Sequence, residues 1–348
     1  MKNILVDQTQ LGNFCGFGNI AENFAPRLAA LREPDLHFVF AVPQRFFGAF
    51  GSGVDYVSRE HFRRDVARLG KHIDLWHATH QFFDYRQRRS DCVQLLTVHD
   101  LNFLTEKHGL HRLKHMLRTR YRVNHSDYIT VISSYVRDQL MAFMDVGPRQ
   151  VEVIYNGISD MDSTGQKRPD FVGKRPFFVA IGQVRRKKNL YTLVPMMDLF
   201  PDHDLFICGD NSFAYPELYA LVKTHAAGRV HVVGRVAADE KTWLYAHADA
   251  LLFPSRLEGF GIPVLEAMRV GCRVVSSRFS CMEEICRNHA AYWDDYSPEA
   301  MAGTVRKAID GWSRSGVEAQ QACSYSKTYN YDSYTQRYLS LYRRLLGL

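Results

Sequence analysis

The stretch "LLFPSRLEGFGIPVLEAMRVG", Leu251 to Gly271, has the pattern of a short strand, a glycine-rich turn and a helix. Pro263 stands where a first helical turn begins, and Gly271 is the expected C-terminal cap of that helix. Glu258 is therefore expected on the loop after a parallel strand, and Glu266 one turn inside the next helix. Both positions face the crevice at the carboxyl ends of the strands, where open α/β sheets bind ligands.

The same alternation of short apolar runs and helix-period segments extends through almost the whole chain. In the first half the predicted strands are "NILVD", "HFVFAVP", "DLWHAT", "VQLLTVHD", "YITVIS" and "VEVIYNG", and in the second half "FFVAIG", "DLFICG", "VHVVG", "ALLFPS" and "CRVVSS". Strands that alternate with helices indicate an α/β fold with parallel sheets covered on both faces. Because 348 residues exceed one ordinary core, we expect two Rossmann-like, doubly wound domains facing each other across a cleft.

Helix-period segments fill the intervals between these strands. In the first half they are Ile20 to Arg32, His111 to Asn124, and Ser134 to Met144 with Ser133 as N-cap; in the second half helices are expected to begin near Asn189, Pro216, Asp239, Pro263 and Pro298. The last stretch, "YDSYTQRYLSLYRRLL", places apolar side chains at helical spacing. It is therefore predicted to be an amphipathic helix packed on the body of the protein.

A polar stretch between the halves, Ser159 to Pro176, lacks apolar periodicity and contains Gly and Pro. It is expected to be the interdomain linker. The predicted domains are residues 1–165 and residues 172–327.

Composition indicates an ordered chain, with 46% hydrophobic and 23% charged residues. The start, "MKNILVDQTQLG", has no signal-peptide pattern, and no apolar run approaches the length of a membrane span. Seven scattered cysteines are typical of free thiols in a reducing compartment. We therefore expect a cytoplasmic protein.

The net charge is +7, and the densest basic stretch, Lys107 to Arg122, holds six Lys or Arg and three His in one predicted helix. One interpretation is a solvated helix face. The alternatives are contact with an anionic membrane, at the inner face of the cytoplasmic membrane, or with an acidic acceptor. A nucleic-acid site is the least supported, because no repeated aromatic residues accompany the charges.

The turn between Glu258 and Glu266 suggests a specific chemistry. Two glycines let backbone N–H groups approach a ligand, and the helix N-terminus behind them favours a phosphate. Carboxylates beside an anion are better suited to accept hydrogen bonds from hydroxyls, so a sugar on each side of a diphosphate is indicated. The alternative is an ordinary turn with two exposed glutamates.

These residues resemble a known family. Glu258 and Glu266, with "EGFG" and "PVLEAM" around them, are similar to the donor site of glycosyltransferase family 4, whose members are retaining enzymes of the GT-B fold. "CGFGN", "TVHD", "VIYNGI" and "IGQVRRKKN" resemble further family motifs in the expected order. The terminal segment resembles the family's last helix, which implies that residues from about 328 to 348 return to the first domain.

The resemblance implies roles for the residues of the donor loop. Glu266 would hold the ribose hydroxyls, and Glu258 would contact the donor sugar near the reacting centre. The backbone at Gly259, Phe260 and Gly261 would touch the sugar hydroxyls.

Further roles are implied outside that loop. Lys187 and Lys188 would neutralise the diphosphate, where negative charge grows in the transition state. His99 would reach the donor sugar across the cleft. Gly16 and Gly18 would let the acceptor and the diphosphate approach the backbone.

No metal or other cofactor is expected. "DMD" and "DHD", which end at Asp162 and Asp204, fit turn chemistry, and the histidines from His77 to His80 and from His108 to His115 lack the partners of a tetrahedral zinc set. Lysines and a helix N-terminus would take over the task of a cation.

The resemblance implies transfer of a hexose, with retention and by front-face substitution, to a saccharide or lipid-linked saccharide in surface polysaccharide or lipopolysaccharide synthesis. GDP-mannose is the first expected donor and UDP-glucose the second. A nucleotide-sugar hydrolase or epimerase and a non-catalytic glycan-binding protein stay open. A dinucleotide-dependent oxidoreductase fits less well, because "GNFCGFG" is not GxGxxG.

Overall fold

The structure is a computed structural model that describes residues 1–13, 16–83, 91–161, 165–213 and 215–348. The chain forms two compact units. Unit 1 comprises Met1–Gly157 and Tyr329–Leu348, and unit 2 comprises Ile158–Thr328. The units thus meet in sequence at Gly157 and Ile158, whereas the predicted first domain extended to residue 165. The described parts of the predicted linker, 159–161 and 165–176, contain no helix or strand.

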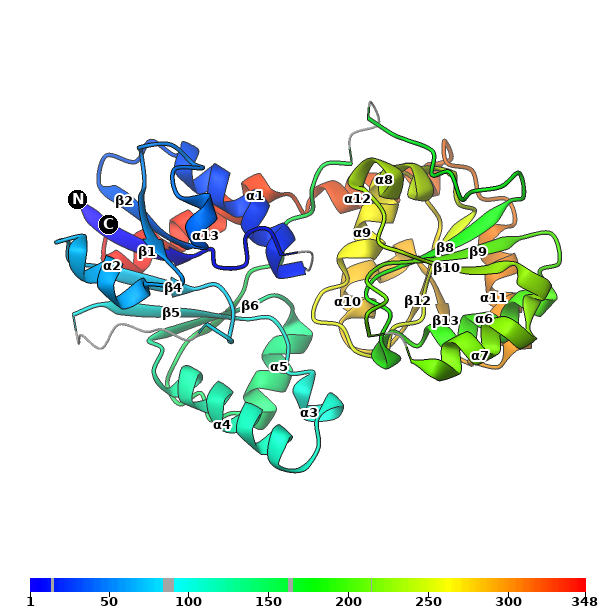
Figure 1. The fold of residues 1–348 in the computed structure, drawn as a ribbon, viewed down its shortest axis with the longest axis horizontal. Helices are drawn as coiled ribbons and strands as arrows, with labels where there is room; N and C mark the ends of the chain where they lie inside the picture. The colour runs from blue at the N-terminus through cyan, green and yellow to red at the C-terminus, as the bar shows by residue number, and fades with distance from the viewer. Residues whose placement is uncertain (14–15, 84–90, 162–164, 214) are drawn as a thin grey trace. The chain divides into compact units, whose positions relative to one another are not determined.

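Unit 1 is built on a parallel sheet of seven strands in the order β3-β2-β1-β4-β5-β6-β7 (Figure 1). The strands are β1 Lys2–Asp7, β2 Leu36–Val42, β3 Asp55–Ser58, β4 Leu75–Ala78, β5 Val93–Val98, β6 Tyr128–Val131 and β7 Val151–Val153. The order steps outward from β1 in both directions, so this is a doubly wound sheet. Its ligand-binding site is expected at the carboxyl ends of β1 and β4, where the strand order reverses.

The helices described in unit 1 are α1 Gly16–Ala30, α2 Phe62–Arg68, α3 Phe103–Glu106, α4 Gly109–Asn124, α5 Ser134–Phe143 and α13 Tyr331–Leu346. Four of them, namely α1, α4, α5 and α13, lie where the periodicity predicted them. Ser133 caps α5 as predicted, because its Oγ accepts the Val136 N–H at 3.2 Å. The short helices α2 and α3 were not predicted.

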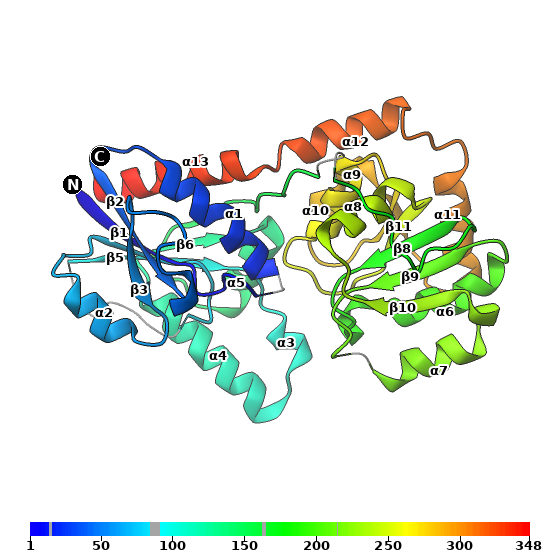
Figure 2. The ribbon, with the colours of Figure 1, turned by 45° about the horizontal axis from the view of Figure 1, so that its top comes forward.

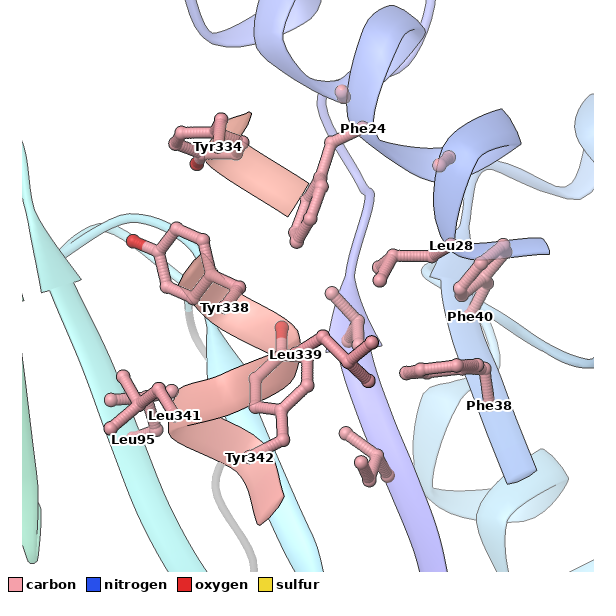
Figure 3. Packing of buried hydrophobic residues seen from close by; sticks show 14 of the residues in the cluster. Phe24, Leu28, Phe38, Phe40, Leu95, Tyr334, Tyr338, Leu339, Leu341 and Tyr342 are labelled. Atoms are coloured by element: carbon pink, nitrogen blue, oxygen red, sulfur yellow. The ribbon is translucent and has the colours of Figure 1, made fainter. Parts of the chain in front are cut away.

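The C-terminal helix α13 belongs to the core of unit 1. It lies beside α1, as Figures 1 and 2 show, and Figure 3 shows its Tyr334, Tyr338 and Tyr342 among the apolar side chains of α1 and the sheet. The Phe24 ring meets that of Tyr334 edge to face, with centroids 5.0 Å apart. The prediction that the terminal helix packs on the first domain is confirmed.

Polar atoms also join α13 to the sheet. His77 Nδ1 lies 2.6 Å from Tyr342 Oη, and its Nε2 lies 2.8 Å from Thr97 Oγ1. The Tyr338 hydroxyl lies 3.0 Å from Thr97 Oγ1 and 3.1 Å from Thr130 Oγ1. Burial lowers the pKa of His77 to about 3, so its ring is neutral and needs no counter-charge.

Unit 2 has a parallel sheet of six strands in the order β10-β9-β8-β11-β12-β13. The strands are β8 Phe177–Ile181, β9 Asp204–Cys208, β10 Val230–Gly234, β11 Ala250–Phe253, β12 Val274–Ser277 and β13 Ala291–Trp293. The order again reverses beside its first strand, so the strand ends of β8 and β11 form the expected binding edge.

The helices of unit 2 cover both faces of this sheet (Figure 1). They are α6 Leu193–Met196, α7 Pro216–Thr224, α8 Ala238–His247, α9 Ile262–Arg269, α10 Met282–Cys286, α11 Pro298–Ile309 and α12 Val317–Lys327. The helical segment expected near Asn189 begins directly after that residue, but it is irregular. Short 3₁₀ turns at Leu190–Thr192 and Met197–Leu199 flank α6, and Pro195 removes an amide from the ladder.

Arg269 at the end of α9 ties together the first and last segments of unit 2. Its Nη1 donates to Asp160 Oδ1 at 2.7 Å and to the Ile158 and Ser159 carbonyls at 3.2 Å. Its Nη2 donates to the Ser326 carbonyl at 2.8 Å. The helix that carries Glu266 is therefore fixed at its far end.

Within the described part of the chain, no helix combines the length and the apolar character that a membrane crossing requires.

Candidate functional site

The two predicted donor loops of unit 2 are bonded to each other. The Arg256 N–H donates to the Lys187 carbonyl at 2.8 Å, and Ser255 Oγ donates to the same carbonyl at 3.3 Å. The loop after β8 thus runs along the loop after β11, as expected for neighbouring parallel strands. Lys187, Lys188 and Glu258 are therefore brought to one edge of the sheet.

Lys188 and Glu258 form an ion pair. Their side chains are only 14% and 12% exposed, so solvent screens this pair less than a surface pair. The Lys188 ammonium also lies 5.3 Å from the centroid of the Phe253 ring. The sequence predicted Lys188 for the diphosphate and Glu258 for the sugar, and the structure places the two in direct contact.

The backbone of Glu258 is held as well. Its N–H donates to Ser280 Oγ at 3.1 Å. A Cβ on Gly182, which follows β8, would lie 3.7 Å from Lys188 Nζ, so the lysine side chain crosses over this glycine. Neither Ser280 nor Gly182 was predicted as part of the site, because Ser280 contacts a loop that is distant in sequence and Gly182 lies under a side chain that folds back over it.

Glu266 lies inside α9 with a side chain only 3% exposed. Its Oε1 accepts from Lys241 Nζ at 2.7 Å, and its Oε2 accepts from the Tyr245 hydroxyl at 3.1 Å. Burial first, and then the charge of Glu266, raise the pKa of Tyr245 well above its usual range, so the phenol remains a donor. A carboxylate has further acceptor sites, so Glu266 can accept additional bonds from hydroxyls.

Lys241 and Tyr245 were not predicted as part of the site. They stand four residues apart on α8 and so share one face of that helix. That spacing was visible in the sequence, but nothing indicated that this face meets α9.

The turn before α9 is tight. Gly261 has a φ of 90°, and a Cβ there would lie 3.1 Å from the Met282 side chain, so glycine is required. Phe260 is buried, and Gly259 is half-buried. Gly271 has a φ of 72° and stands just beyond the last turn, as predicted for the end of this helix.

In unit 1, His99 follows β5 and is nearly buried. Its Nε2 donates to the Thr79 carbonyl at 2.8 Å, and its own N–H donates to Gln81 Oε1 at 3.1 Å. The Phe17 ring meets the imidazole edge to face at 4.8 Å. Burial lowers the pKa of His99 to about 3, so the ring is neutral and its lone pair is on Nδ1.

A pocket in unit 1 lies beside His99. It is lined by Gln8, Gln10, Phe17, Ile20, Ala21, Phe24, Thr79, His80 and His99. His80 Nε2 lies 3.1 Å from Oδ2 of the fully buried Asp7, whose Oδ1 accepts from the Thr9 amide and hydroxyl. Among the described residues, the buried Gln8 amide nitrogen finds no acceptor. This pocket was not predicted, although "HATH" and "VDQTQ" border it.

The two predicted glycines of unit 1 differ. A Cβ on Gly18 would lie 1.8 Å from the Asn13 carbonyl oxygen, whereas a Cβ on Gly16 would meet nothing within 4 Å in the described structure. Gly18 therefore permits the chain to pack on itself. Gly16 is exposed, and the space beside it would admit a side chain.

Across the described ranges, no three His, Cys, Asp or Glu side chains come together as a metal site.

The fold is that of known enzymes. Anabaena HepE, solved in complex with UDP-glucose, superposes with a TM-score of 0.75 over 99% of this chain and 100% of that chain, at 16% identity. The class defined by the two parallel-sheet units is thus the GT-B fold, as predicted.

Two family models match most of the chain. "Glycosyltransferase Family 4" matches residues 21–160, and "Glycosyl transferases group 1" matches residues 163–327. The chain therefore belongs to glycosyltransferase family 4, and it is an enzyme of the glycosyltransferase class.

Two curated relatives are bacterial enzymes. O-antigen chain mannosyltransferase RfbU of Salmonella typhimurium is 25% identical over 64% of this chain and 63% of its own length. O-antigen chain mannosyltransferase B of Escherichia coli is 21% identical over 82% of this chain and 78% of its own length. The match with RfbU thus spans less than two thirds of that protein.

Proposed function

We propose that the chain transfers mannose from GDP-mannose to a hydroxyl of a saccharide acceptor, with retention, in the synthesis of a surface polysaccharide. The observation that carries the proposal is the pair of glutamates around the turn before α9, of which Glu266 is buried and Glu258 nearly so, with Lys188 against Glu258. The choice of mannose is supported by two relatives that are named O-antigen mannosyltransferases.

The donor would be held by the groups at the strand ends of unit 2. Lys187 and Lys188 supply positive charge for the diphosphate, and the N-terminus of α9 adds the positive end of its helix dipole. Lys188 exchanges its ion pair with Glu258 for a phosphate oxygen when the donor binds. That exchange leaves the Glu258 carboxylate to accept hydrogen bonds from the sugar.

Glu266 would accept hydrogen bonds from the ribose hydroxyls. Lys241 and Tyr245 already orient its carboxylate, which lowers the entropic cost of binding. The two glutamates thus have different tasks: Glu258 acts on the group that is transferred, and Glu266 acts on the nucleotide that leaves.

Retention requires attack from the face that the leaving group occupies, or a covalent intermediate. We propose front-face attack, in which the departing phosphate oxygen accepts the proton of the acceptor hydroxyl while Glu258 orients the sugar. His99, a neutral ring, would contribute a hydrogen-bond acceptor and no charge.

The reaction is proposed to need no metal ion, because lysines and a helix N-terminus neutralise the charge that develops on the diphosphate. Activity should therefore survive treatment with EDTA followed by desalting. An activity lost with EDTA and restored by Mn²⁺ or Mg²⁺ would refute this part of the proposal.

The donor is tested by thermal shift with GDP-mannose, GDP, UDP-glucose and UDP. A ligand that binds the folded state alone stabilises it, by about 2.7 kcal/mol at a concentration of 100 times its Kd. We expect the guanosine ligands to raise the Tm more than the uridine ligands. The reverse order would favour a UDP-sugar donor, the second candidate, for which the UDP-glucose complex of HepE is the precedent in this fold.

Hydrolysis of the donor is the alternative reaction. Product analysis with and without a mannose-containing oligosaccharide separates the two. Transfer predicts a product longer by one hexose and slow turnover without acceptor, whereas equal release of free mannose in both samples would indicate a hydrolase.

A further inference from the structure

Helix α4 exposes a row of apolar side chains. Leu110, Leu113, Leu117 and Tyr121 are 83%, 43%, 55% and 45% exposed. Their spacing of three, four and four residues places them in one stripe along the helix, because an α-helix has about 3.6 residues per turn. An exposed apolar stripe of this kind marks an interaction surface.

The stripe points away from the core. The buried residues of α4 are Thr119 and Val123, and Thr119 stands two positions from Leu117, which is more than half a turn around the helix. The side of α4 that faces the core of unit 1 thus carries other residues than the stripe. Figures 1 and 2 both show α4 along the lower edge of unit 1.

The charged side chains of α4 itself all have one sign. The sixteen residues of α4 include five Lys or Arg and no Asp or Glu. The exposed Lys114 and Arg120 stand next to the stripe on its two sides, as the helical spacing shows. Apolar side chains flanked by cations are complementary to a lipid surface with anionic headgroups, since the cations meet the headgroups and the leucines enter the boundary below them.

We propose that α4 is a peripheral docking surface for an anionic membrane, with the stripe of Leu110, Leu113, Leu117 and Tyr121 inserted between the headgroups. The occupant is a lipid bilayer and not a protein groove, because α4 carries only cationic charges and two of them, Lys114 and Arg120, flank the leucines on the two sides. The proposal does not depend on which sugar or nucleotide the enzyme uses.

The test is co-sedimentation of the full chain with vesicles. One set is phosphatidylcholine alone, and the other is an equal mixture of phosphatidylcholine and phosphatidylglycerol. We expect binding to the mixed vesicles, weaker binding to the neutral ones, and a decrease as salt is added. Absence of binding to the mixed vesicles would overturn the proposal, whatever the donor assays show.

Two variants separate the apolar and the charged contributions. Leu110→Gln/Leu113→Gln/Leu117→Gln replaces the three leucines of the stripe with residues of good helix propensity and should lower the partition coefficient on the order of 100-fold. Lys114→Gln/Arg120→Gln should lower it on the order of 30-fold, from about 1 kcal/mol per charge near an anionic surface.

Matched controls come from unit 2. A third variant, Leu117→Gln alone, should also bind more weakly than the wild type, and Val317→Gln is its control because Val317 is 69% exposed. Lys223→Gln/Lys307→Gln is the control for the two charges, because both lysines are exposed near helix ends. The controls should bind as the wild type does, and all variants should keep its circular dichroism and Tm, since exposed side chains contribute little to stability.

The remaining outcomes also decide the matter. Equal losses in the variants and their controls would overturn the proposal, because the effect would then be one of net charge or solubility. Full binding by the leucine variant, with loss only in the basic variant, would indicate a general polyanion site such as one for nucleic acid. That result would overturn it too.

Discussion

The carboxyl ends of the two sheets carry different chemistry on the same frame. In unit 2 they include the ion pairs of Lys188 with Glu258 and of Lys241 with Glu266. In unit 1 they hold the neutral His99, and the pocket beside it is lined by the amides of Gln8 and Gln10. There the acid, Asp7, is fully buried against His80 and Thr9.

This contrast supports a division of tasks between the units. Ion pairs at a sheet edge can exchange partners with a charged ligand, and we therefore propose that unit 2 receives the diphosphate and its flanking hydroxyls. Neutral donors and acceptors suit a ligand without charge, and we propose that unit 1 receives the saccharide hydroxyls. The following predictions test whether this contrast has functional meaning.

The largest effect is expected from Glu258→Gln, which keeps the shape of the side chain and removes its charge. We expect kcat to fall on the order of 100-fold to 1000-fold, because a charged group that orients the reacting sugar is lost. Steady-state kinetics with the preferred donor measure this. The control is Glu299→Gln, an exposed glutamate of α11, which should leave kcat unchanged. Unchanged kcat in Glu258→Gln would show that Glu258 takes no part in catalysis and that the difference between the two sheet edges is not a catalytic one.

Acid should affect unit 1 through its buried histidines. The pKa values of His77 and His99 are about 3 in the folded chain, against about 6.5 in an unfolded one. Their stability contribution is therefore present above about pH 6.5 and is lost as the pH falls toward 3. At about pH 5 the loss is about 2 kcal/mol per histidine.

Urea unfolding, followed by hydrogen exchange in peptides of β4 and α13, measures this loss. His77→Gln is the matched variant, because glutamine keeps a donor and an acceptor but does not titrate. The variant should lose about half of the acid sensitivity. A difference between about pH 7 and about pH 5 as large as in the wild type would show that His77 does not carry the effect.

The two lysines of unit 2 should differ from each other. Lys188→Met and Lys241→Met each leave a nearly buried glutamate without its cation and should destabilise unit 2 by about 1–2 kcal/mol, since Lys241 is partly exposed. Lys188→Met should also weaken GDP-mannose binding, by about tenfold or more, because its ammonium binds the diphosphate directly. Lys241→Met should weaken it less, because Lys241 acts on the donor only by orienting Glu266. The Tm and calorimetric titration measure the two effects.

The double variant Lys241→Met/Glu266→Gln is the control for stability, because it removes the stranded charge. It should regain part of the Tm. Equal losses of donor affinity in Lys188→Met and Lys241→Met would contradict separate roles for the two pairs.

The smallest effect concerns the glycines of unit 1. Gly18→Ala should cost about 1 kcal/mol or more, because its Cβ would overlap the Asn13 carbonyl. Gly16→Ala has room and should leave the Tm unchanged. Thermal unfolding followed by circular dichroism compares them, and equal Tm values would show that the loop adjusts freely.

Much of the fold could be predicted from local patterns. Central strands such as β1 and β8 are buried on both faces and so are continuous apolar runs. The strands β3 and β13 were missed because they are short and lie at sheet edges, where partial exposure weakens the signal. The tyrosines of α13 gave a clear helical period, and their burial confirms it.

The candidate site was predictable only in part. Its residue types and its place after β11 followed from the sequence, as did the glycine at position 261. The partners Lys241, Tyr245 and Ser280 could not be predicted, because each reaches the site from another element. The pocket beside His99 was missed for the same reason.

Local sequence patterns were enough to predict the alternation of strands and helices, the terminal helix and the two glutamates around a turn, since these depend on neighbouring residues and on local periodicity. Only the tertiary structure decided that Lys188 neutralises Glu258, that Lys241 and Tyr245 hold Glu266, and that His99 is neutral. Charge state and pairing depend on burial and on distances between atoms far apart in the chain, and no local pattern encodes those.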